Sequence, residues 1–255
     1  MSLLLQNATY RIGNKELIKS VTIFSEPGHL TAIVGPNGAG KSTALKLMCG
    51  DLQLTEGTAS VNKKNIYSYT PKELAGIRAV LPQQTSPAFG CKVWEVVALG
   101  RAPFDETEIQ KARHVEEVLS VVDALYLANR DLETLSGGEK QRVLLAKALI
   151  QVFEYDSVLN RKKYLLLDEP TASLDLKQTH VVMKILRKAA DSGLGVLLVI
   201  HDLAVARSYG DTVFVMKNGK INSFGAPNKV LTLAKIAESF DIDMDTAAAS
   251  FSLTP

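Results

Sequence analysis

The chain has 255 residues and a formal net charge of +2, from 29 basic and 27 acidic side chains. Hydrophobic residues make up 46% of the sequence, which supplies enough apolar side chains for a core and excludes a disordered chain. Because the charges nearly balance, the chain lacks the excess of positive charge that is typical of proteins that bind nucleic acid. We therefore expect a globular protein of one or two domains that does not bind nucleic acid, and a single elaborated α/β domain also fits this length.

The cysteines and the apolar runs indicate the compartment in which the chain works and whether it crosses a membrane. Cys49 and Cys91 are the only cysteines, and their spacing matches neither a disulfide framework nor a metal site, so a reducing compartment is expected. The amino terminus reaches the polar Gln6 after three leucines, which is too short an apolar run for a signal peptide. Because no apolar run approaches the ~20 residues of a spanning helix, we expect a chain that does not cross a membrane by itself.

The first fifty residues are expected to form short strands that lead into a helix. Strands are predicted over Leu3–Tyr10 and Leu17–Phe24, on either side of the turn residues Gly13-Asn14. A third strand, Leu30–Val34, enters a glycine-rich loop, and a helix over Lys41–Cys49 follows.

The middle of the chain is expected to be helical, and the last third returns to alternating strands and helices. Apolar residues at steps of three and four predict an amphipathic helix over Thr107–Leu127. Apolar runs such as Leu165–Leu167 indicate strands buried on both faces, as in a parallel sheet. The tail Asp241–Pro255, rich in Ala, Ser and Asp, is predicted to be poorly ordered. The other expected elements are helices over Val93–Leu99 and Glu139–Ile150 and from Leu176, strands over Tyr164–Leu167, Gly195–Ile200 and Thr212–Met216, and a hairpin turn at Lys217–Lys220.

The glycine-rich loop matches the phosphate-binding pattern G-x-x-x-x-G-K-[ST]. It reads Gly35-Pro36-Asn37-Gly38-Ala39-Gly40-Lys41-Ser42, and each of these residues, with Thr43, is a candidate nucleotide contact. Glycines let backbone N–H groups close around phosphate oxygens, and the helix that follows presents its positive end to the anion. Lys41 is predicted to reach the β- and γ-phosphates, and Ser42 to offer its hydroxyl to Mg²⁺.

Two further strands end in side chains that suit phosphoryl transfer. The strand Tyr164–Leu167 runs into Asp168 and Glu169, of which the first is predicted to hold Mg²⁺ through water and the second to polarise the attacking water. The strand Val196–Ile200 runs into His201, which would sense the γ-phosphate if the two strands are neighbours. Taken alone, either ending is also compatible with a purely structural role.

A pair of glycines in the first turn of a helix gives the most informative segment. Ser136-Gly137-Gly138-Glu139 reads as a serine N-cap, but two glycines there cost the helix about 1 kcal/mol each. Close approach to an anion explains them, with the Ser136 hydroxyl and the Gly138 N–H as donors to a γ-phosphate.

With these motifs, the chain resembles the ATP-binding subunits of ABC transporters over nearly its whole length. Ser136–Glu139 is similar to the family's signature, and Ser173-Leu174-Asp175 to the segment that follows the carboxylate pair. The resemblance implies that Gln83 carries the family's glutamine role and helps to hold Mg²⁺, with the adjacent Gln84 left open as the alternative. It also implies that Tyr10 stacks on adenine, that Asp175 contacts nucleotide and that His201 is the switch histidine. For Tyr10, the alternative that it is an ordinary tyrosine of the sheet stays open.

The resemblance implies a P-loop nucleoside triphosphatase core, with a mostly parallel sheet and an antiparallel β region, from residues 1–84 and 161–255. Residues 85–160 would form a helical subdomain that carries the signature. ATP would lie between the phosphate loop of one copy and the signature of another in a head-to-tail homodimer. The expected partners are an integral membrane permease and, indirectly, a substrate-binding protein, which puts the chain peripherally at the cytoplasmic face of the inner membrane.

Three further segments resemble importers of metal chelates. These are Arg78–Gln83, Glu95–Pro103 and Leu203–Ala206. The polar stretch Gln151–Lys163 is similar to an insertion in haem-importer subunits, with a neutral loop insertion as the open alternative. The segment Phe89–Lys92 departs from the haem-importer pattern. The resemblance therefore implies ATP-driven haem import, with a ferric-siderophore or cobalamin importer as the alternative. A non-transport ABC-type ATPase is a remote alternative, and Ser136–Glu139 argues against a P-loop kinase or GTPase.

Overall fold

The computed structural model describes residues 2–83, 90–152, 162–172 and 174–252. Most of its strands belong to one six-stranded sheet in the order β10-β9-β3-β8-β7-β6. Every neighbouring pair in this sheet is parallel except β10 and β9, which form a hairpin. The strands are β3 (Leu30–Val34), β6 (Arg78–Leu81), β7 (Tyr164–Asp168), β8 (Gly195–Val199), β9 (Thr212–Lys217) and β10 (Lys220–Gly225).

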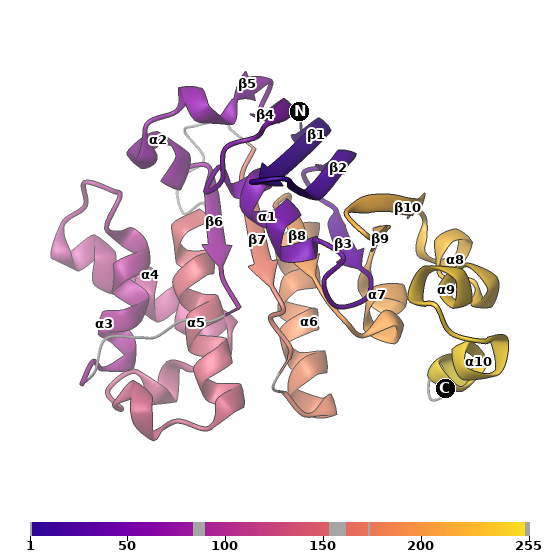
Figure 1. Cartoon of the computed structure of the whole chain (residues 1–255). Coiled ribbons are helices and arrows are strands. Elements are labelled where there is room, and N and C mark those ends of the chain that lie inside the picture. The colour runs from indigo at the N-terminus through magenta and orange to yellow at the C-terminus, as the bar shows by residue number, and fades with distance from the viewer. Residues whose placement is uncertain (1, 84–89, 153–161, 173, 253–255) are drawn as a thin grey trace.

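A second, antiparallel sheet has the order β2-β1-β4-β5. Its strands are β1 (Leu3–Ile12), β2 (Lys15–Ser25), β4 (Glu56–Val61) and β5 (Lys64–Asn65). The helix α1 (Lys41–Cys49) lies between the two sheets, because its apolar residues belong to the same core as Leu3 and Leu5 of β1 and Leu166 of β7 (Figure 1). The predicted α/β fold with an antiparallel β region is thus observed.

The other face of the large sheet packs against helices. In β7, Leu166 faces the α1 side whereas Leu165 and Leu167 face a second core formed with these helices. Because both faces are buried, the strand reads as an uninterrupted apolar run rather than as an alternating one. The main helices of this side are α3 (Val93–Ala98), α4 (Glu108–Val121), α5 (Gly137–Val152), α6 (Leu176–Asp191) and α7 (Leu203–Tyr209).

Figure 1 shows that α3, α4 and α5 gather beside β6, at one edge of the sheet. We propose that they form the helical subdomain predicted over residues 85–160. The short helices at the other end of the sheet are α8 (Pro227–Val230), α9 (Leu233–Phe240) and α10 (Met244–Ser252), and α2 (Pro71–Ala75) precedes β6.

Two predictions about helices need correction. The helix predicted over Thr107–Leu127 ends at Val121, because Asp123 takes a left-handed conformation (φ +53°) and a separate 3₁₀ turn follows at Leu125–Leu127. The tail predicted to be poorly ordered from Asp241 contains the helix α10 over Met244–Ser252, whose Ala247 is fully buried against the rest of the core. Residues 253–255 lie outside the described part.

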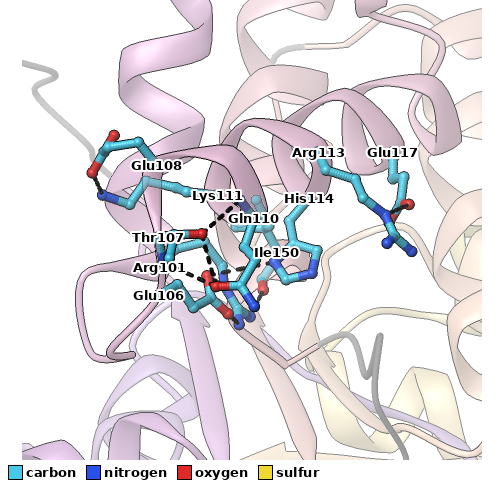
Figure 2. Close-up of polar contacts among 10 residues, drawn as sticks. All are labelled: Arg101, Glu106, Thr107, Glu108, Gln110, Lys111, Arg113, His114, Glu117 and Ile150. Carbon is cyan, nitrogen blue, oxygen red and sulfur yellow. Dashed lines mark hydrogen bonds and ion pairs between the residues drawn. The ribbon is translucent and has the colours of Figure 1, made fainter.

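A cluster of charged side chains joins the segment after α3 to α4 and to the end of α5 (Figure 2). Arg101 pairs with Glu106, and its Nη1 donates to the carbonyl oxygen of Ile150 at 2.7 Å. His114 of α4 lies 3.4 Å from the same carboxylate. Arg101 is only 6% exposed, and its hydrogen bonds hold the pKa of Glu106 below its usual range. The cluster is therefore a desolvated ion pair at the centre of the helical group.

We expect Arg101→Ala to lower the free energy of unfolding by about 3–5 kcal/mol, because it leaves the mostly buried Glu106 carboxylate (13% exposed) without its guanidinium partner. The difference from the parent should shrink as the pH falls below the usual glutamate pKa of about 4.3, since a carboxylate with a lowered pKa stabilises the fold only while ionised. Urea unfolding at pH 7 and pH 4 measures both effects. The matched control is Arg113→Ala, whose pair with Glu117 is at the surface and should be worth at most about 0.5 kcal/mol. Equal losses in the two variants would contradict the assignment.

Candidate functional site

The motif residues meet at the carboxyl edge of the large sheet. In the sheet, β8 lies between β3 and β7, with Val199 opposite both Ile33 and Asp168. The phosphate loop after β3, the carboxylates after β7 and His201 after β8 consequently lie side by side. This is the edge at which open α/β sheets bind ligands.

The phosphate loop requires glycine at two positions for reasons of space. A Cβ at Gly35 would lie 2.1 Å from the carbonyl oxygen of Met216, and one at Gly40 would lie 2.9 Å from the Ile18 side chain. Gly38 also has a positive φ (+77°), but no atom would lie within 4 Å of a Cβ there. The loop is therefore held tightly against β9 and β2 and is open at its middle.

We expect Gly35→Ala to weaken ATP binding by at least about tenfold, because the loop must move away from Met216. Gly193→Ala is the matched control, because Gly193 also has a positive φ (+103°), no atom would lie within 4 Å of a Cβ there, and it is not one of the residues that line the cleft, so the change brings only backbone strain of about 1–2 kcal/mol. Titration with a fluorescent ATP analogue and thermal unfolding of both variants test this. A loss of ATP affinity in Gly193→Ala as large as that in Gly35→Ala would show that the close approach to β9 does not matter.

Lys41, the first residue of α1, points its ammonium into the loop. Its Nζ donates to the carbonyl oxygens of Gly35 at 2.8 Å and Pro36 at 3.0 Å, and the residue is only 5% exposed. Burial lowers the pKa of Lys41, while the nearby Glu169 and Asp168 carboxylates act in the opposite direction. The loop, the lysine and the start of a nine-residue helix together offer positive charge and N–H groups to an anion.

Ser42 and Asp168 lie next to the lysine and suit a hard cation. The Ser42 hydroxyl donates to Oδ1 of Asp168 at 3.0 Å, so two oxygen ligands already converge. Burial raises the pKa of Asp168, which is 5% exposed. Among the residues that the structure describes, no group of three or more His, Cys, Asp or Glu side chains could hold a metal. Such a sparse oxygen set fits Mg²⁺, which is usually held by one or two protein ligands together with phosphates and water.

Glu169 is held on both carboxylate oxygens. Gln83 Nε2 donates to Oε2 at 2.7 Å, and His201 Nε2 lies 2.5 Å from Oε1. The backbone of Glu169 has φ +52°, an unfavourable region for a residue with a Cβ, and its N–H donates to the carbonyl of Val199 at 3.0 Å. The chain thus accepts backbone strain to orient this carboxylate, which is common at functional sites.

Glu169 and His201 line a cleft of about 340 Å³ together with the phosphate loop. The β1–β2 hairpin forms its remaining wall through Lys15 and Leu17, which the sequence analysis missed. Their contact with the loop depends on how the two sheets pack, so no local pattern could have indicated them. The lining residues are Lys15, Leu17, Asn37, Gly38, Ala39, Gly40, Lys41, Ser42, Thr43, Glu169 and His201.

Tyr10 lies on β1 opposite Ile18, whose side chain borders Gly40. It is partly buried against the core between the sheets and is not one of the residues that line the cleft. Its stacking on adenine therefore stays a prediction. So does the choice between Gln83 and Gln84, because Gln84 lies outside the described residues.

The signature segment begins α5 in the predicted manner. The Glu139 carboxylate accepts from the N–H and the hydroxyl of Ser136 at 2.8 and 2.7 Å, which closes a capping box and lowers the pKa of Glu139. Asp175 is the N-cap of α6, where its Oδ1 accepts from the N–H of Gln178 at 2.7 Å. Of the described residues that line the cleft, none comes from Ser136–Glu139 or is Asp175. Ser173 lies outside the described part.

The fold and this arrangement of motifs define a P-loop nucleoside triphosphatase with a signature segment outside its own phosphate cleft. Residues 18–172 match the family model described as "ABC transporter". The chain belongs to the ABC transporter family and has an ATP-binding domain. The predicted resemblance and the predicted fold class are confirmed.

Curated relatives and solved structures agree with this assignment. The chain is 41% identical over 234 residues to "Hemin import ATP-binding protein HmuV" of Gloeobacter violaceus, a match that covers 91% of this chain and 84% of that protein. It is 38% identical to the protein of the same name from Pseudoalteromonas translucida, covering 93% and 91%. The "Dimeric Structure of MJ0796, a Bacterial ABC Transporter Cassette" has a TM-score of 0.75 at 26% identity, covering 88% of this chain and 98% of that one.

The helices of the chain can also be compared with the length and hydropathy that a membrane-spanning helix requires. Among the described residues, no helix is both long and apolar enough to cross a bilayer.

Proposed function

We propose that the chain is the ATP-hydrolysing subunit that powers haem import through a separate membrane permease. The observation that carries ATP hydrolysis is the Glu169 carboxylate, held by Gln83 and His201 at the edge of the phosphate-loop cleft. The names of the curated relatives support haem as the cargo.

The phosphate loop would bind the triphosphate. Its N–H groups and Lys41 neutralise the β- and γ-phosphates, and Thr43 extends the contact along α1. Ser42 and Asp168 would hold Mg²⁺, assisted by Gln83. When bound, the ion neutralises charge on the phosphate oxygens.

Glu169 would orient and polarise the water that attacks the γ-phosphate. Both of its oxygens accept hydrogen bonds in the structure, so the carboxylate is fixed rather than free to rotate. His201 borders the same cleft and would contact the γ-phosphate. Gln83 follows β6 and contacts Glu169, and through this residue the nucleotide state would reach the permease.

A second copy of the chain would complete the site. The signature segment Ser136–Glu139 is absent from the lining of this chain's described cleft, so its donors would serve the nucleotide of a partner in a head-to-tail homodimer. The dimeric cassette to which the chain is similar supports this arrangement. ATP that bridges both copies favours the closed dimer, and hydrolysis removes the bridge.

A peripheral position at the cytoplasmic face of the inner membrane follows from this function. The permease would contribute the translocation path, and a substrate-binding protein would interact with the permease rather than with this chain.

The test is an affinity purification of tagged Glu169→Gln from native membranes with Mg-ATP, followed by mass spectrometry of the partners. The control is tagged Lys41→Ala treated in the same way, because a variant that binds ATP poorly should not be trapped with ATP. A polytopic permease together with a haem-binding protein supports the proposal. A permease with a siderophore- or cobalamin-binding protein overturns the cargo, and recovery of only soluble proteins or nucleic acid overturns the transport role.

A further inference from the structure

The second glycine of the signature segment packs against a side chain from α6. A Cβ at Gly138 would lie 3.0 Å from Cγ, Cδ and Oε1 of Gln178. Gln178 is partly buried and stands one turn after Asp175, the N-cap of the same helix. Glycine at 138 therefore lets the start of α5 approach the start of α6.

Arg142 fixes this approach by hydrogen bonds. Its Nη1 donates to Oε1 of Gln178 at 2.7 Å, and its Nη2 donates to the Tyr126 hydroxyl at 3.2 Å. The Tyr126 hydroxyl in turn donates to the Glu139 carboxylate at 3.4 Å, and Glu139 accepts from Ser136. Arg142 is 6% exposed, so its charge has few alternatives to these partners in water.

Gln178 is also connected, through its backbone N–H, to the N-cap of α6. The N–H of Gln178 donates to Asp175 while its side chain accepts from Arg142. Gln178 thus links the segment after the carboxylate pair with the signature helix α5. Its partner Arg142 lies 36 positions earlier in the sequence.

We propose that Gln178 and Arg142 are positioning residues that set the signature segment against the start of α6, and so set how tightly this segment binds a nucleotide held by a second copy of the chain. The inference rests on the proposed function, because it assigns the signature donors to a partner's ATP. A surface ion pair would not have this effect, since water competes for exposed partners. Here the guanidinium is buried, and Gln178 also forms the surface on which Gly138 lies.

The test compares Gln178→Ala and Gln178→Glu in the Glu169→Gln background, with Lys184→Ala as an exposed control on the same helix. Sedimentation with and without Mg-ATP gives the dimer dissociation constant, and a fluorescent ADP analogue gives the affinity of the phosphate loop within one chain. Loss of a hydrogen bond to a charged donor should raise the ATP-dependent dimer dissociation constant about tenfold or more in Gln178→Ala. Gln178→Glu keeps an oxygen for Arg142 and should restore the dimer. ADP affinity should stay at the parent's value in all three variants. The melting temperature should stay at the parent's value in Gln178→Glu and Lys184→Ala, whereas Gln178→Ala should melt at a lower temperature but remain folded, because it leaves the buried Arg142 guanidinium without one acceptor.

The remaining outcomes separate a failure of the inference about Gln178 from a failure of the proposed function. Parent-like dimerisation of Gln178→Ala overturns the inference and leaves the proposed function standing. A dimer defect that Gln178→Glu does not restore, or one that Lys184→Ala shares, also overturns it, as does an equal loss of ADP affinity. If the Glu169→Gln parent forms no ATP-dependent dimer, the proposed function itself fails and the inference fails with it.

Discussion

Replacing Glu169 by glutamine should lower the rate of ATP hydrolysis by about 100- to 10,000-fold, the range that a positioned general base contributes. The amide has nearly the same shape, and its one oxygen can still accept from one of the two groups, Gln83 and His201, that hold the carboxylate. It cannot, however, take a proton from water. ATP affinity should stay the same or increase, because a negative charge is removed beside the phosphates.

Steady-state phosphate release and a nucleotide titration measure the two effects separately. Glu238→Gln is the matched control, since its side chain is exposed on α9, away from the residues that line the cleft. We expect parent-like hydrolysis from this control. Phosphate release by Glu169→Gln within a few-fold of the parent would refute the assignment of Glu169 as the residue that activates water.

Replacing Lys41 by alanine should raise the ATP dissociation constant by roughly 100-fold. The ammonium is buried in the loop with two carbonyl oxygens as acceptors, and hydrogen bonds to charged groups are worth about 1.5–3 kcal/mol each. Two such bonds to phosphate at the lower value correspond to this change in affinity. Hydrolysis at low ATP concentration should fall in parallel, because less nucleotide is bound.

Isothermal titration with Mg-ATP gives the affinity, and thermal unfolding shows whether the variant is folded. Lys46→Ala removes an exposed lysine from the same helix and should change the affinity by no more than about twofold. An unchanged ATP affinity in folded Lys41→Ala would contradict the role of the phosphate loop.

Local patterns predicted most of the secondary structure and the identity of the motifs. The apolar strands over Leu30–Val34 and Leu165–Leu167 are recognisable because burial on both faces requires an uninterrupted apolar run. The phosphate loop is recognisable because its glycines and lysine must be consecutive to surround an anion. The elements β4, β5, β6, α2, α8 and α9 were missed, because each is short and carries neither a long apolar run nor a sustained helical period.

The helical tail shows where such patterns mislead. Asp241–Pro255 has a composition typical of a poorly ordered end, yet α10 forms up to Ser252 because Ala247 has a buried position and Asp243 accepts from the N–H of Thr246 at the start of the helix. Composition averages over a segment, whereas order depends on whether a few side chains find a partner surface.

By itself the sequence determined the family, the phosphate loop, the carboxylate pair and the signature, since each consists of neighbouring residues whose chemistry shows in their order. Only the tertiary structure decided that Gln83 contacts Glu169 across 86 positions, and that Gln178 binds Arg142. These contacts arise from the order of strands in the sheet and from the approach of the amino-terminal part of α5 to that of α6. Local periodicity does not encode either, because many strand orders and helix pairings bury the same apolar faces equally well.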